Sequence, residues 1–168
     1  MFTKNWYKGL FGKMVTGSAV SAIATDGTAN AASYAYMTKS STEKQTNCPL
    51  GCIQTSDITR YGGVAFGTGT TPPTLDDYCL SGDMIAGIVA SCVFQENSDD
   101  SGCTLTMVYT IVNNNRSEIT IGEVAAFCGS GGSTKGFMLE RTMLDSPVTI
   151  PAGGVGQVTY TIRMNYPT

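Results

Sequence analysis

Two adjacent carboxylates, Asp76 and Asp77, are the first residues whose types could do chemistry. A pair of carboxylates can serve as general acid and base in a hydrolase. However, Thr74 stands three positions before Asp77, which is typical of a helix start, where acidic residues interact favourably with the exposed amides. We therefore interpret both aspartates as the N-terminal charges of one helical turn over Leu75 to Leu80.

A second acidic stretch, Gln95 to Asp100, carries enough side-chain oxygens to consider a calcium site. It lacks the ligand spacing and the final glutamate of an EF-hand loop, so we interpret it as the polar tip of a hairpin. Charged residues within predicted strands are explained by ion pairing on the protein surface. These residues are Glu118, Glu123, Glu140 and Arg141.

Cysteines could be buried thiols, disulfide partners or metal ligands. Cys48 and Cys52 have a C-x3-C spacing, but a zinc knuckle needs a second close pair and none follows. Cys92 and Cys103 have a separation that suits the facing strands of a hairpin. The spacing favours buried free thiols, and we predict no metal ion and no cofactor. The cysteines are Cys48, Cys52, Cys79, Cys92, Cys103 and Cys128.

The 168 residues include no histidine. A Ser-His-Asp triad, a Cys-His pair and imidazole metal ligands are therefore excluded. Imidazole is also the usual general base near neutral pH, so its absence disfavours an enzyme. The remaining residues show no pattern of nucleophile, base and oxyanion hole, and we predict a protein without catalytic residues.

Charged residues are scarce, because 10 Lys or Arg and 13 Asp or Glu make up only 14% of the chain, against about 25% in an ordinary soluble domain. With a net charge of −3, the chain lacks the excess of basic residues that is typical of a nucleic-acid-binding protein. No apolar run is long enough for a membrane-spanning helix, and polar residues interrupt the stretch Val15 to Thr25, so we expect no cleaved signal peptide. Such a surface predicts that neighbouring subunits cover part of it, in a symmetric homo-oligomer or a lattice.

The first fifteen residues have the pattern of a short amphipathic helix. Apolar side chains recur every four residues, and Phe11 widens the stripe. A helix this short is marginal in water, so it must lie against something. It could cover an edge of its own domain, or it could anchor the chain in a neighbouring subunit through large apolar side chains. The candidate partner-interface residues are Phe2, Trp6, Leu10, Phe11 and Met14.

The elements that must position these residues follow from hydrophobic spacing. Cys103 to Val112 and Gln157 to Tyr166 alternate apolar and polar residues, which is typical of half-buried strands. We predict a mainly β fold, an antiparallel, jelly-roll-like β-sandwich over residues 57–168, with a helix and an extended arm over residues 1–56. The other predicted strands are Ile58 to Gly67, Met84 to Phe94, Glu118 to Cys128, Lys135 to Leu144 and Val148 to Ile150, with a turn at Asp145-Ser146-Pro147.

Two longer stretches carry a family resemblance. They are Tyr61-Gly-Gly-Val-Ala-Phe-Gly-Thr-Gly-Thr-Thr-Pro-Pro-Thr-Leu-Asp-Asp-Tyr-Cys-Leu and Leu139-Glu-Arg-Thr-Met-Leu-Asp-Ser-Pro-Val-Thr-Ile-Pro-Ala-Gly-Gly, the second followed by Val158-Thr-Tyr-Thr-Ile. Together with the opening Thr3-Lys-Asn-Trp-Tyr-Lys, they resemble small virion structural proteins of tailed bacteriophages.

The resemblance covers most of residues 57–168 and includes no catalytic motif. It implies a non-enzymatic protein that is assembled in the host bacterial cytoplasm and located in the virion, as a capsid-decoration, neck or tail component. Its implied partners are other virion proteins and copies of itself. The alternative is a host-recognition module that binds a glycan or a surface protein through loops such as Gly67 to Asp77 and Gly129 to Ser133.

Overall fold

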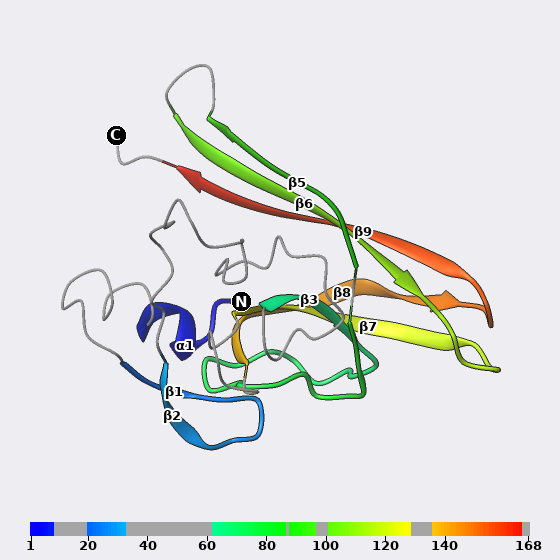
Figure 1. Cartoon of the computed structure of the whole chain (residues 1–168), viewed down its shortest axis with the longest axis horizontal. Coiled ribbons are helices and arrows are strands. Elements are labelled where there is room, and N and C mark those ends of the chain that lie inside the picture. The colour runs from blue at the N-terminus through cyan, green and yellow to red at the C-terminus, as the bar shows by residue number, and fades with distance from the viewer. Residues whose placement is uncertain (9–19, 33–61, 87, 97–100, 129–135, 166–168) are drawn as a thin grey trace, which may run out of the picture.

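In the computed structural model of the chain, the described residues are 1–8, 20–32, 62–86, 88–96, 101–128 and 136–165. They form a mainly β fold in which the described strands of each sheet pair antiparallel, as predicted (Figure 1). The elements are α1 (Lys4–Tyr7), β1 (Val20–Ile23), β2 (Ala29–Ala32), β3 (Gly62–Gly67), β4 (Met84–Ala86), β5 (Ile88–Glu96), β6 (Gly102–Val112), β7 (Ile119–Cys128), β8 (Phe137–Ile150) and β9 (Val155–Asn165).

These strands form a small hairpin and two larger sheets. Strands β1 and β2 form the hairpin, the order in the four-stranded sheet is β4-β3-β7-β8, and the order in the three-stranded sheet is β5-β6-β9. The chain alternates between the two larger sheets, entering the three-stranded sheet at β5 and again at β9. Figure 1 shows the two sheets meeting near the β8–β9 turn and diverging away from it.

One hydrophobic core joins the two larger sheets. The predicted alternation of β6 is confirmed, because its Met107, Tyr109 and Ile111 are buried and contribute to this core. Phe66 and Val124 enter the same core from the four-stranded sheet. The side chains between them on β6 point to the opposite face and are only half-buried.

Strand β7 is buried on both of its faces from Ile121 to Cys128. Its second face lies under the loop that connects β3 to β4, residues 68–83, which we call the β3–β4 loop. Leu80 of this loop packs with Ala125, Phe127 and Met138 in a separate buried cluster. A strand enclosed in this way can hold a charged side chain only if the protein supplies partners for it.

The N-terminal residues add to the outer edge of β8. Phe2 forms a β-bridge with Glu140, the amide of Thr3 donates to the carbonyl of Leu139 at 2.9 Å, and the amide of Arg141 donates to the carbonyl of Met1 at 3.0 Å. The helix that follows has only four described residues, and residues 9–15 of the predicted helix lie outside the described part.

Three predictions about the elements were wrong in part. The predicted extended arm contains a β-hairpin at residues 20–32. The predicted strand from Met84 is two strands in different sheets. The turn predicted at Asp145-Ser146-Pro147 is a bulge within β8, because Met143 pairs with Glu123 and Val148 pairs with Ile121, so that one residue of β7 faces four residues of β8.

Candidate functional site

A buried carboxylate, Glu123 on β7, holds the β3–β4 loop against the sheet. Its side chain is 0% exposed. Its Oε1 atom accepts hydrogen bonds from the amides of Gly69 at 3.1 Å, Ser81 at 3.0 Å and Gly82 at 2.9 Å. One carboxylate therefore satisfies amides from both ends of the loop.

The neighbouring strand supplies the countercharge. Arg141 on β8 is 2% exposed, and its Nε donates to Glu123 at 2.6 Å. Its Nη1 donates to Asp77 at 2.6 Å, and its Nη2 donates to the carbonyl of Thr71 at 2.5 Å and to the hydroxyl of Ser81 at 2.9 Å. All three guanidinium nitrogens are thus occupied. We call Asp77, Ser81, Glu123 and Arg141 the buried ion cluster.

Electrostatics in the cluster favour the charged forms. Burial alone would raise the pKa of Glu123, but the hydrogen bonds from Arg141 and the loop amides outweigh burial and lower it. The pKa of Asp77 is also lowered, because the hydrogen bonds from Thr74 and Arg141 outweigh its burial. Both carboxylates stay ionised at neutral pH and are occupied as acceptors, so the arrangement can fix the loop but offers no proton to donate.

The sequence interpretation of these residues was wrong in two respects. Glu123, Glu140 and Arg141 are buried, not surface pairs, with exposures of 0%, 6% and 2%. No helix forms over 75–80, although Thr74 and Asp77 do make the expected reciprocal contacts, with the Thr74 amide and hydroxyl donating to the carboxylate at 2.9 and 2.7 Å. The sequence signal is only partial, because Glu123 and Arg141 each interrupt an apolar strand pattern with opposite charge but nothing in the sequence places them side by side.

The lowered pKa values predict a pH dependence of stability. A carboxylate with a lowered pKa in the folded state stabilises the fold above its ordinary pKa, and this contribution is lost as the pH falls. The ordinary values are 4.5 for Glu123 and 3.8 for Asp77. We expect the free energy of unfolding to fall as the pH drops from about 4.5, measured by urea denaturation at several pH values.

Replacing Arg141 with methionine gives this prediction its control. The guanidinium is one of the causes that lower the pKa of Glu123, so without it this pKa should rise and protonation should cost the variant less stability than it costs the wild type. The difference in stability between wild type and Arg141→Met should therefore shrink in acid. A difference that stays constant between neutral pH and pH 3 would contradict the assigned role of the ion pair.

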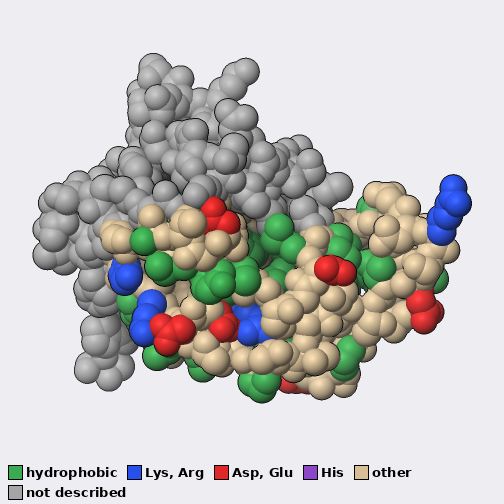
Figure 2. Space-filling view, turned by 90° about the horizontal axis from the view of Figure 1, so that it is seen from below, with side chains coloured by type: hydrophobic (Ala, Val, Ile, Leu, Met, Phe, Trp, Pro, Cys, Tyr) green, Lys and Arg blue, Asp and Glu red, His purple; other side chains and the backbone are tan. Residues whose placement is uncertain are grey.

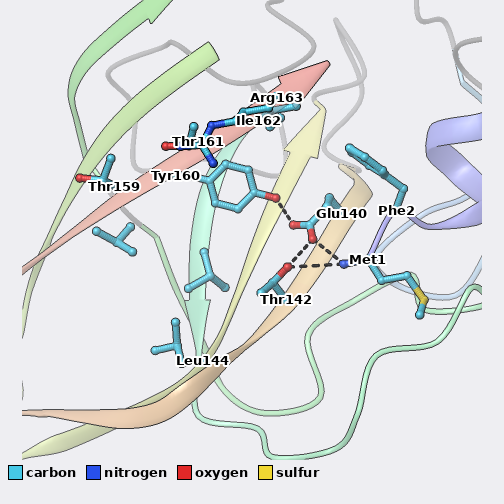
Figure 3. A pocket seen from close by; sticks show the side chains of 12 residues that line it. Met1, Phe2, Glu140, Thr142, Leu144, Thr159, Tyr160, Thr161, Ile162 and Arg163 are labelled. Carbon is cyan, nitrogen blue, oxygen red and sulfur yellow. Dashed lines mark hydrogen bonds and ion pairs between the residues drawn. The ribbon is translucent and has the colours of Figure 1, made fainter. Parts of the chain in front are cut away.

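A second polar group lies in a cleft between the edge strands β8 and β9 (Figure 3). The cleft encloses about 400 Å³. The carboxylate of Glu140 accepts hydrogen bonds from the Met1 amine at 2.6 Å, from the Thr142 hydroxyl at 2.5 Å and from the hydroxyl of Tyr160. Burial and the Glu140 carboxylate raise the pKa of Tyr160, so the phenol stays protonated and donates.

The walls of this cleft are mainly apolar. They come from both edge strands, from Val124 of β7 and from the first residues of the chain (Figure 3). The carboxylate at its centre is already bound by three donors. What the cleft offers is therefore apolar surface beside an open strand edge. Its apolar lining includes Phe2, Val124, Leu144, Val158 and Ile162.

The predicted interface residues fall partly outside the described part. Phe2 and Trp6 stack on each other with ring centroids 4.6 Å apart, and Trp6 packs against a buried cluster of the chain's own domain that includes Phe137 and Leu139. Leu10, Phe11 and Met14 are not described. The two described aromatics thus cover their own domain, and anchoring in a neighbouring subunit stays a prediction.

Four of the six cysteines lie in the described part of the chain, and Cys92 among them is on β5 opposite Met107 of β6. Cys79 and Cys103 are free thiols, and Cys128 is buried. Burial and the nearby Asp77 carboxylate raise the pKa of Cys79, which keeps its thiol protonated at neutral pH. Among the described residues, no group of three potential ligands could hold a metal ion. In that same part of the chain, no helix is long and apolar enough to cross a membrane.

No protein-family model, no curated protein and no solved structure matches the chain.

Proposed function

We propose that the chain is a non-enzymatic virion structural protein of a tailed bacteriophage. In this proposal the two larger sheets face each other as a β-sandwich, and the protein binds neighbouring subunits on the capsid surface, the neck or the tail. The sequence resemblance to small virion structural proteins supports this class of function. The observation that carries the proposal is the composition of one face of the three-stranded sheet.

The outer sheet face is the side of the three-stranded sheet that points away from the shared core. The register of β5, β6 and β9 places thirteen described side chains on it, and only one of them is charged. Val93 is 55% exposed there. A broad, partly exposed face with threonine, valine and a single charge has few groups that keep a surface solvated and is suited to contact with another subunit. The residues are Val93, Gln95, Thr104, Thr106, Val108, Thr110, Val112, Val155, Gln157, Thr159, Thr161, Arg163 and Asn165.

Charge is sparse elsewhere too. Figure 2 shows acidic and basic side chains in small groups on the face seen from below, with hydrophobic side chains between them. The N-terminal segment remains a second candidate contact, because Met1 and Tyr7 are 51% and 47% exposed beside the packed Phe2 and Trp6.

A matched pair of valine substitutions tests the outer sheet face. Val93 and Val148 are 55% and 51% exposed, but Val148 lies on β8, away from this face. We expect Val93→Lys to reduce the copies of the protein in purified phage particles several-fold, because a lysine charge would have to lose water in the interface. Val148→Lys should leave the copy number near that of the wild type, with quantitative mass spectrometry as the measurement.

Particle composition also tests the whole proposal. The wild-type protein should be present in purified particles at a fixed copy number that fits a symmetric position. Absence of the wild-type protein from particles would overturn the proposed function. Equal incorporation of both valine variants would instead remove the outer sheet face from it.

A further inference from the structure

The two larger sheets have four edges, and three of them are protected against further pairing. Strand β4 has only three residues. Strand β5 has a register shift between Val89 and Ser91. Strand β8 is covered by the first residues of the chain at one part of its edge and has the bulge with Pro147 at another. Short strands, bulges, proline and covering segments are the usual devices against edge-to-edge association.

The fourth edge, β9, has none of these devices. Its eleven residues pair with β6 without a register shift, and the strand contains no proline. Arg163 is its single charged residue. Among the described residues, no strand pairs with the other side of β9. An edge this long and regular presents a row of backbone donors and acceptors to the solvent.

We propose that a second copy of this chain pairs antiparallel with β9, edge to edge, and joins two three-stranded sheets into one continuous sheet. This inference rests on the proposed function in that it names one contact, between two copies of the chain, by which the proposed subunits would assemble. A two-fold axis makes the pairing reciprocal, since each copy offers the donors and acceptors that the other needs.

The residues of β9 are compatible with antiparallel pairing of this strand with β9 of a second copy. An axis centred on Tyr160 places Thr159 opposite Thr161 of the second copy, which are small exposed side chains on the outer face. It also places Arg163 opposite Gln157, so the two arginines do not face each other. Cross-strand pairs of this kind avoid the repulsion that like charges would cause.

Apolar side chains on the other face of β9 support the same partner. The axis through Tyr160 places Val158 opposite Ile162, and both of these half-buried residues line the cleft beside β8. In the paired form, apolar walls of the two clefts would be neighbours in one continuous sheet. The backbone pairing thus brings together apolar surface that each copy leaves partly open.

Sedimentation velocity of the purified full chain tests the pairing. We expect the wild type to sediment as a dimer or a larger assembly that contains the dimer. The double variant Thr159→Lys with Thr161→Lys places lysine opposite lysine twice, and we expect it to raise the dissociation constant by roughly tenfold or more. The control, Thr70→Lys with Ser146→Lys, adds the same charge at two exposed positions of the β3–β4 loop and β8, away from β9 and from the outer sheet face, and should have a much smaller effect.

A charge-exchange experiment keeps the test independent of solubility and folding. Thr159→Glu with Thr161→Glu should also dissociate, but an equal mixture of the lysine and glutamate variants should form a heterodimer. A wild-type chain that is monomeric at high concentration, or a mixture without heterodimers, overturns β9 pairing. A monomer that still enters phage particles leaves the proposed function intact, whereas a dimer that is absent from particles overturns the function alone.

Discussion

Replacing Arg141 with methionine is expected to lower the free energy of unfolding by about 3–5 kcal/mol. Among the described residues, Arg141 is the only ion-pair partner of Glu123. The substitution removes this partner from a carboxylate whose side chain is 0% exposed. It also leaves the carbonyl of Thr71 and the carboxylate of Asp77 without their bonds to the guanidinium. A buried charge without compensation costs far more than a lost surface contact. Chemical denaturation at neutral pH measures the effect.

Two further variants separate the ion pair from a general effect of losing an arginine. Arg116 is exposed, so Arg116→Met should change stability by less than about 0.5 kcal/mol. Adding Glu123→Gln to Arg141→Met removes the uncompensated charge and should restore part of the loss, as a double-mutant cycle would show. If Arg141→Met were as mild as Arg116→Met, the buried ion cluster would not hold the fold together.

Gly82→Ala is expected to destabilise the protein by about 3 kcal/mol. A Cβ at this position would lie 2.4 Å from the amide nitrogen of Gly69 and 2.8 Å from the backbone carbon of Thr68. Backbone atoms cannot move aside as a flexible side chain can, so the two ends of the β3–β4 loop would separate. The hydrogen bond from the Gly82 amide to Glu123 would be strained at the same time.

The neighbouring loop residue Thr70 provides the control for this prediction. Thr70 is exposed, so Thr70→Ala removes a side chain from the same loop without crowding its backbone. We expect an effect within about 0.5 kcal/mol, and urea denaturation measures both variants. A Gly82→Ala protein as stable as wild type would show that the two ends of the loop do not need their close approach.

Sequence patterns could predict the strands whose two faces differ in environment. Strands β6 and β9 have one face toward the core and one toward solvent, so their side chains alternate and their positions were predicted closely. The Asp145-Ser146-Pro147 segment looked like a turn because its composition is that of turns. On an edge strand the missing amide of Pro147 can face away from the sheet, so a bulge accommodates the segment and β8 continues.

The buried ion cluster could not be predicted for a different reason. Strand β7 is buried on both faces, so its sequence has no alternation that would mark Glu123 as facing inward. The amides that hold Glu123 belong to Gly69, Ser81 and Gly82, which have no side-chain signature for this role. Which strands become neighbours is a property of the whole topology, and it brings Arg141 beside Glu123.

The way Glu123 holds the β3–β4 loop has a consequence for how the sequence can change over time. Its bonds to the loop go mostly to backbone amides near the two ends, while Leu75 and Tyr78 in the middle are 49% and 38% exposed. Substitutions at the loop's outer positions therefore leave the bonds that fix its ends intact. The ends of the loop are therefore fixed by backbone hydrogen bonds, whereas its exposed residues can be substituted without loss of the fold.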